Sequence, residues 1–159
     1  MGNRRAMSRR ARARLGAVAV GLLLAGLPAA AWAHAVFLSS DSVPANSDQK
    51  LTLNVPEEKG PSVHNTKVVF VVPAGFKVAG CDQKPQWSCA VAGASEGRTT
   101  VTYTRSSGDD PDGRFSFGVH TPGPGDYPFQ TNQTYSDNST TRWNGPPDSD
   151  TPAPVLKVH

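Results

Sequence analysis

The stretch KVVFVV, residues 67–72, sets the expectation for the fold. Four valines and a phenylalanine stand within these six residues, and Pro73 follows directly. β-Branched and aromatic residues favour strands, and a proline ends the pattern because it has no N–H to donate to a sheet. We therefore predict a strand over these residues.

Similar stretches lie on both sides of it along the chain. They are short, their apolar residues recur at every second position, and turn residues bound them: LTLNV (51–55), TTVTYT (99–104), RFSFGV (114–119) and PVLKV (154–158). No convincing helical periodicity longer than two turns occurs after residue 34. Roughly seven to nine short strands within about 125 residues are typical of an antiparallel β-sandwich, which we predict as a single domain.

The segments between these stretches are rich in Gly, Pro, Asp and Ser. PAGFKVAG, SSGDDPDG and TPGPGD are predicted to be loops, and GPPDSDTPAP (145–154) a stiff polar connector to the last strand. No internal repeats are present.

The first 33 residues have a different character. Residues 1–14 carry six arginines and no acid, and residues 15–31 are almost wholly apolar. This apolar run is shorter than the ~20 residues that a spanning helix needs, and Ala31-Trp32-Ala33 has the small-x-small form that signal peptidase reads. We predict a secretory signal peptide over residues 1–33 and an exported, extracytoplasmic domain over residues 34–159.

Loss of the leader would reverse the net charge. The remaining 126 residues hold ten Lys and Arg against thirteen Asp and Glu, a formal charge of about −3. The basic character of the whole chain then belongs to targeting, so we exclude nucleic acid as a partner. No second apolar run precedes His159, so no transmembrane anchor is expected in the mature chain.

Cys81 and Cys89 are the only cysteines. In an oxidising compartment two nearby cysteines most often pair, so a disulfide is predicted. A metal site made of the two thiolates is the alternative.

Cleavage after Ala33 would make His34 the first residue. Its free α-amine and its Nδ1 could then form a six-membered chelate ring with one metal ion, and both can lose their protons near neutral pH. Two nitrogens at a fixed distance favour Cu(II) or Ni(II), and Cu(II) has the higher intrinsic affinity. Both methionines, Met1 and Met7, leave with the leader, so soft ligands for Cu(I) would be absent. The alternative is that His34 is simply the residue after the cut.

Two long segments bear on this alternative: residues 39–76, from SSDSVPANSD to VVPAGF, and residues 133–158, QTYSDNSTTRWNGPPDSDTPAPVLKV. Together with the histidine after the leader, they resemble the YcnI-like copper-binding family of exported bacterial proteins. The resemblance covers nearly the whole mature chain. It implies an immunoglobulin-like antiparallel β-sandwich, in agreement with the strand pattern.

The resemblance also implies a metal site, a single-histidine brace that binds Cu(II). Its ligands are the N-terminal amine and Nδ1 of one histidine and the carboxylate of a glutamate, with a tryptophan close by. The histidine corresponds to His34 and the tryptophan to Trp143. The glutamate follows Val55-Pro56, where Glu57 and Glu58 are both candidates and the spacing favours Glu58.

Other interpretations of these residues stay open. The glutamates could form a solvated strand end, and Trp143 could be an ordinary core residue. His64, His120 or His159 could instead join His34 in a two-histidine brace, as in the copper monooxygenases that cleave polysaccharides.

The leading hypothesis is a copper-buffering or copper-delivery protein that is not an enzyme and whose protein partner is another extracytoplasmic copper protein. A structural or adhesive surface module and a copper-dependent oxidase are the alternatives.

Overall fold

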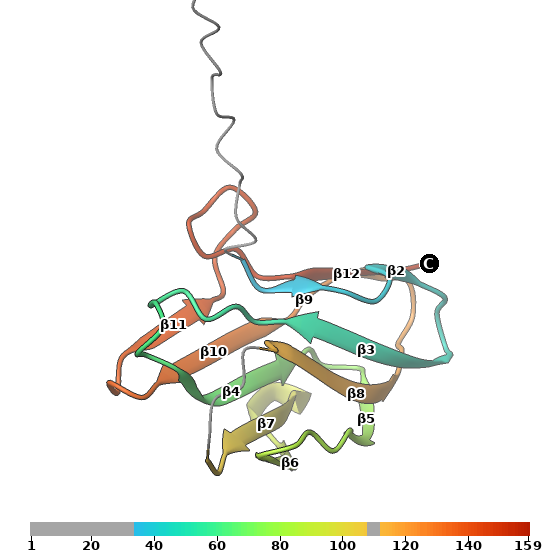
Figure 1. Ribbon diagram of the computed structural model, residues 1–159. Helices are drawn as coiled ribbons and strands as arrows, with labels where there is room; N and C mark the ends of the chain where they lie inside the picture. The colour runs from blue at the N-terminus through green and yellow to red at the C-terminus, as the bar shows by residue number, and fades with distance from the viewer. Residues whose placement is uncertain (1–33, 108–111) are drawn as a thin grey trace, which may run out of the picture.

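The computed structural model describes residues 34–107 and 112–159, and the predicted leader over residues 1–33 lies outside this part of the chain. The described residues form twelve strands and one short 3₁₀ turn, Ser95–Gly97 (Figure 1). The strands are β1 (Val36–Phe37), β2 (Ser42–Val43), β3 (Asp48–Asn54), β4 (Asn65–Val72), β5 (Lys77–Cys81), β6 (Trp87–Gly93), β7 (Thr99–Arg105), β8 (Arg114–His120), β9 (Gly125–Pro128), β10 (Gln130–Tyr135), β11 (Thr140–Trp143) and β12 (Val155–Val158).

Two sheets form the sandwich. One has the strand order β1-β3-β8-β5 and the other β11-β10-β4-β7-β6, with all neighbours antiparallel. A third, smaller sheet has the order β2-β12-β9, in which β2 and β12 run parallel. The predicted antiparallel β-sandwich is therefore confirmed, with one parallel pair added.

Alternating side chains of the two sheets fill the core. In β4 every second residue is buried, and Val68, Phe70 and Val72 point inward. From the opposite sheet, Phe115 and Phe117 of β8 meet Phe70, with ring centroids 5.9 and 5.4 Å apart. Each such apolar side chain contributes roughly 1.5–3 kcal/mol by leaving water, so this contact is a main source of stability.

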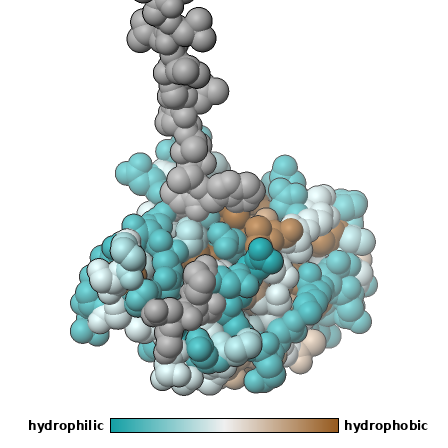
Figure 2. All heavy atoms as spheres, viewed as in Figure 1, coloured by the Kyte–Doolittle hydropathy of each residue, from teal (hydrophilic) through white to brown (hydrophobic). Residues whose placement is uncertain are grey.

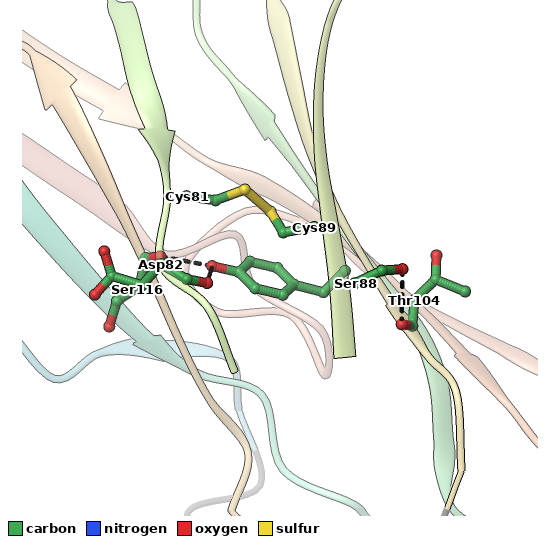
Figure 3. Close-up of a disulfide and its surroundings, with 7 residues drawn as sticks. Cys81, Asp82, Ser88, Cys89, Thr104 and Ser116 are labelled. Atoms are coloured by element: carbon green, nitrogen blue, oxygen red, sulfur yellow. Dashed lines mark hydrogen bonds between the residues drawn. A yellow bond between two sulfur atoms is a disulfide. The ribbon is translucent and has the colours of Figure 1, made fainter. Parts of the chain in front are cut away.

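The predicted disulfide between Cys81 and Cys89 is present (Figure 3). Cys81 ends β5 and Cys89 lies in β6, and these strands are the last of their respective sheets. The bridge therefore joins the two sheets at the edge of the sandwich that β5 and β6 form. The opposite side is formed by the other two end strands, β1 and β11.

Several loop predictions were wrong in part. PAGFKVAG contains most of β5, and TPGPGD contains the start of β9. β5 was missed because its pairing with β8 shifts register between Val78 and Gly80, which interrupts the alternation of side chains. The predicted loop SSGDDPDG includes residues 108–111, which lie outside the described part.

Figure 2 shows a mainly hydrophilic face with hydrophobic side chains gathered in its upper part. Within residues 34–107 and 112–159, no helix has the length and apolar character needed to cross a membrane. The segment 145–154 folds back on itself rather than running straight, since Gly145 and Pro152 pair as an isolated bridge.

Candidate metal centre

The position of His34 follows from the pairing of the strand after it. β1 lies antiparallel to β3, with Val36 opposite Asn54 and Phe37 opposite Leu53. Continued backwards, this register directs residue 34 toward the segment that follows β3, which contains both candidate glutamates. His34 itself is exposed, whereas Ala35 next to it is 2% exposed. The chain therefore presents His34 at the rim of the sandwich.

Trp143 reaches the same rim from the other sheet. It ends β11 and is 1% exposed, yet its ring contacts the His34 ring edge-on, with the centroids 5.9 Å apart and the planes at 80°. The structure thus brings together the predicted histidine and tryptophan. The two interpretations of Trp143 are compatible, because the residue belongs to the core and also contacts His34.

The two glutamates have different surroundings. Both carboxylate oxygens of Glu57 have partners: Oε1 accepts from the Asn65 N–H at 2.8 Å and from Arg105 Nη1 at 3.4 Å, and Oε2 lies 3.2 Å from His64 Nδ1. The Arg105 side chain is 5% exposed, so this is a largely buried ion pair. Glu57 therefore holds the segment after β3 in place.

Glu58 is the glutamate that remains available. No hydrogen bond found among the described residues uses its carboxylate, whereas the backbone of Glu58 itself forms a hydrogen bond with the Tyr135 hydroxyl. Burial raises the pKa of the Glu58 carboxyl, while the nearby charge of His34 acts in the opposite direction. The carboxylate thus lies within electrostatic reach of the imidazole.

A buried glutamine, Gln133 of β10, connects Trp143 to the glutamate segment. Its side chain bonds to the indole of Trp143, to the Pro56 carbonyl and to Asn65. No role of Gln133 was predicted from the sequence. The feature that could have indicated it is its position, because Thr131, Gln133 and Tyr135 occupy alternate positions of β10 and are all buried, although few residues of this strand are apolar.

Within the described part of the chain, Lys59 forms no ion pair with either glutamate. Its Nζ lies 3.6 Å from an Asp137 carboxylate oxygen and donates to Ser139 Oγ at 2.5 Å. It also lies 5.1 Å from the centre of the Tyr135 ring. The positive charge of Lys59 is therefore largely directed to Asp137.

The other histidines have partners of their own. His64 contacts Glu57, His120 Nδ1 lies 2.7 Å from Asp48, and His159 Nδ1 lies 3.3 Å from Ser42 Oγ. Across the described chain, no three His, Cys, Asp or Glu side chains form a cluster that could hold a metal ion. A brace with a second histidine and a further acidic or thiolate ligand therefore has no support from this geometry.

An open hollow of about 300 Å³ adjoins His34. Its lining is largely apolar and comes from β1 and from the proline-rich segment, including Ala35, Phe37, Pro147, Pro152 and Pro154. The imidazole is therefore reachable from outside on this side, whereas Trp143 covers another.

The donor set suits a metal ion that prefers nitrogen and oxygen. The His34 imidazole and the Glu58 carboxylate, which accepts no hydrogen bond from any described residue, lie within electrostatic reach of each other. A terminal amine would be added by cleavage before His34. Both cysteines are in the disulfide, so neither thiolate is available as a ligand, and the predicted thiolate alternative is excluded. Imidazole, amine and carboxylate together favour tetragonal coordination.

Comparison with known proteins agrees with this description. "Copper-binding protein CutI" of Bacillus subtilis (strain 168) is 27% identical over 146 residues, which cover 89% of this chain and 69% of CutI. A crystal structure of an uncharacterised Nocardia farcinica protein, described as immunoglobulin-like, superposes with a TM-score of 0.65 at 22% identity and covers 79% of this chain and 97% of that one. A cohesin module of a family 33 glycoside hydrolase from Clostridium perfringens gives 0.55 at 9% identity, covering 79% and 96% of the two chains.

The immunoglobulin-like fold is thereby confirmed. The family described as "Domain of unknown function (DUF1775)" matches residues 34–158, from the candidate ligand to the last strand. This chain belongs to the DUF1775 family, and its resemblance to the YcnI-like proteins is confirmed.

Proposed function

We propose that this chain is an exported protein that binds Cu(II) with a single-histidine brace. The ligands are the α-amine and Nδ1 of His34 and the carboxylate of Glu58, with Trp143 beside them. The observation that carries the proposal is the contact between His34 and Trp143, which adjoin the edges of two different sheets. Glu58 lies within electrostatic reach of His34, and no side chain of residues 34–107 or 112–159 bonds to its carboxylate. The similarity to CutI supports copper as the metal.

Export and copper binding are linked in this proposal. Cleavage after Ala33 creates the amine, because in the precursor the same nitrogen is an amide that carries no available lone pair. The precursor therefore binds copper poorly, and the site becomes complete only outside the cytoplasm.

The oxidation state follows from the donors. The chain after residue 33 has no methionine, and its two cysteines form a disulfide. Nitrogen and carboxylate ligands favour Cu(II), whereas Cu(I) prefers sulfur. The carboxylate of Glu58 offsets one of the two positive charges of the ion.

The role is copper buffering, or delivery to another extracytoplasmic copper protein, without catalytic turnover. The hollow beside His34 leaves one side of the site open, which suits the release of a metal to a partner. Trp143 limits the access of water on the side that it covers.

The test compares two proteins that differ by one residue. One begins at His34 and the other retains Ala33, which places an amide where the amine is required. Cu(II) is titrated into both, and electron paramagnetic resonance is recorded. We expect one equivalent with nitrogen splitting for the first protein, and binding at least about tenfold weaker for the second.

Equal affinity of the two proteins would refute the brace. Weak binding of several equivalents by both would favour the adhesive module. Hydrogen peroxide formation by the copper-loaded protein with a reductant would favour the oxidase.

A further inference from the structure

We propose that Gln133 is a positioning residue for the copper site, an inference that rests on the proposed function. Its side-chain amide joins Trp143 to the segment that carries Glu58, so that two parts of the site are held in place before the metal binds. Gln133 lies in β10, is completely buried and does not belong to the proposed ligands.

All the hydrogen bonds of the Gln133 amide go either to Trp143 or to groups that hold the segment with Glu58. Gln133 Oε1 accepts from Trp143 Nε1 at 3.0 Å, and Nε2 donates to the Pro56 carbonyl at 2.7 Å and to Asn65 Oδ1 at 2.6 Å. The orientation of the amide is fixed by chemistry, because an indole N–H can only donate and a carbonyl can only accept. Both N–H donors of Gln133 are used.

These bonds continue into the glutamate segment. Pro56 precedes Glu58 by two residues, and Asn65, which receives the second bond, donates from Nδ2 to the Val55 carbonyl at 3.4 Å. The Asn65 N–H also donates to Glu57. Residues 55, 56 and 57 are therefore each tied to Gln133 or to its partner, and the direction in which Glu58 leaves this segment is restricted.

The same amide fixes the ring of Trp143. The indole N–H is buried with its ring in the core, so Gln133 Oε1 supplies the acceptor that this donor needs. If the acceptor were removed, the ring would have to turn or admit water. Either change would alter the edge-on contact with His34.

Thr131 provides a matched control. It lies two residues before Gln133 in the same strand, is fully buried and pairs directly with Trp143 across β10 and β11. Its Oγ1 has no hydrogen-bond partner among the described residues. Thr131→Val therefore changes a buried polar group beside Trp143 without breaking a bond.

The experiment uses the protein that begins at His34, with Gln133→Met and Thr131→Val as variants. We expect Gln133→Met to bind Cu(II) about 10- to 100-fold more weakly, as is typical when a partner of a metal-site residue is lost. Its electron paramagnetic resonance spectrum should broaden, whereas Thr131→Val should match the wild type in both measurements. A purely structural role would lower the stability of Gln133→Met and leave affinity and spectrum unchanged, and that result would overturn the proposal.

A second variant covers the case in which Gln133→Met does not fold. Gln133→Glu has nearly the same shape and keeps an oxygen for the indole N–H. Because the position is fully buried and faces two acceptor oxygens, the carboxyl group is held protonated and supplies one donor in place of the two that bond to Pro56 and Asn65. We expect this variant to bind Cu(II) more weakly than the wild type. Binding as tight as in the wild type would overturn the proposal.

A copper-free measurement separates this inference from the proposed function. Trp143 and Trp87 are the tryptophans after residue 33, and the difference from Trp143→Phe isolates the emission of Trp143. We expect this emission to shift to longer wavelength in copper-free Gln133→Met and to stay unchanged in Thr131→Val. If the wild type binds no Cu(II), the proposed function fails; an unchanged emission in Gln133→Met refutes the positioning of Trp143.

Discussion

At the scale of single residues, Glu57 and Glu58 show how neighbours of the same type take different roles. Glu57 is held by Arg105, Asn65 and His64, whereas the Glu58 carboxylate has none of these partners. The two side chains also differ in exposure, because Glu57 is half-buried whereas Glu58 is exposed. The Glu57 carboxylate stabilises the fold, and the Glu58 carboxylate is the one proposed as a metal ligand.

Substitution should separate these two roles. Glu58→Gln is expected to lower Cu(II) affinity at least about tenfold, since it removes a charged ligand. Glu57→Gln should instead destabilise the protein by about 3 kcal/mol, because it leaves Arg105 buried without its counter-charge. Copper titration and denaturant unfolding of both variants test this assignment. Loss of affinity in Glu57→Gln alone would identify Glu57 as the ligand.

The raised pKa of Glu58 predicts that its charged carboxylate lowers the stability of the copper-free protein at neutral pH. Glu58 is an exposed residue whose carboxyl is only partly buried; this partial burial raises its pKa above the ordinary value of 4.5, so the folded state binds the proton somewhat more tightly than the unfolded state does. This contribution to stability is complete below the unfolded value and is lost as the pH rises through the folded value. At neutral pH the charged carboxylate is therefore destabilising.

Copper-free Glu58→Gln should accordingly be more stable than the wild type at about pH 7, and the advantage should disappear below about pH 4. Denaturant unfolding of both proteins at the two pH values measures this. An advantage that persists at the lower pH would attribute the gain to packing instead of charge.

At the scale of elements, apolar alternation decided which strands were predictable. The stretches 67–72 and 114–119 were found because their inward residues are valine and phenylalanine, and both lie within observed strands, β4 and β8. β10 was missed because two of its three inward residues are Thr131 and Gln133, which a hydropathy pattern assigns to the surface. Gln133 is accommodated inside because its amide bonds to Trp143, Asn65 and the Pro56 carbonyl, and only the structure shows these partners.

The same limit applies to the candidate site. The disulfide could be predicted from the spacing of the cysteines and from the predicted compartment. The roles of His34, Glu58 and Trp143 were predicted from a family resemblance and from the predicted leader. Neither source shows that β1 and β11 lie on the same side of the sandwich. That neighbourhood depends on the strand order of both sheets, and it is what places Trp143 against His34.

The disulfide at one edge of the sandwich and the proposed copper site at the other edge should not affect each other. Cys81 and Cys89 join β5 and β6, whereas His34 and Trp143 adjoin β1 and β11 at the other ends of the same sheets. Replacing both cysteines by serine should destabilise the protein by about 2–3 kcal/mol, because the unfolded chain gains freedom. Copper affinity should change less than about twofold, since sites without shared partners are nearly additive.

Thermal unfolding and Cu(II) titration of the double serine variant check both parts of this expectation. A large loss of affinity with the fold intact would show that the disulfide also sets the geometry of the distant edge.

At the scale of the whole molecule, Tyr103 joins the two sheets through a polar contact inside the core. It extends from β7, and its single hydroxyl hydrogen is shared between the Ser116 carbonyl of β8 at 2.6 Å and the Asp82 carbonyl at 3.2 Å. Burial raises the pKa of Tyr103 to about 12, with the charge of Asp82 as a further cause. The neutral phenol is therefore part of what holds the sandwich closed.

This contact predicts how the molecule responds to alkali. The folded pKa of Tyr103 lies above the ordinary value of 10.0, so its contribution to stability is present below pH 10.0 and is lost as the pH rises through about 12. Tyr103→Phe should be less stable than the wild type at about pH 8, because two carbonyls lose a donor, by about 1–3 kcal/mol. Its stability should then fall less steeply than that of the wild type between about pH 10 and 12. Unfolding free energies across this range, with tyrosinate absorbance to follow ionisation, measure the difference. Parallel curves for the two proteins would show that the alkaline loss of stability arises elsewhere in the molecule, and that Tyr103 ionises without opening the sandwich.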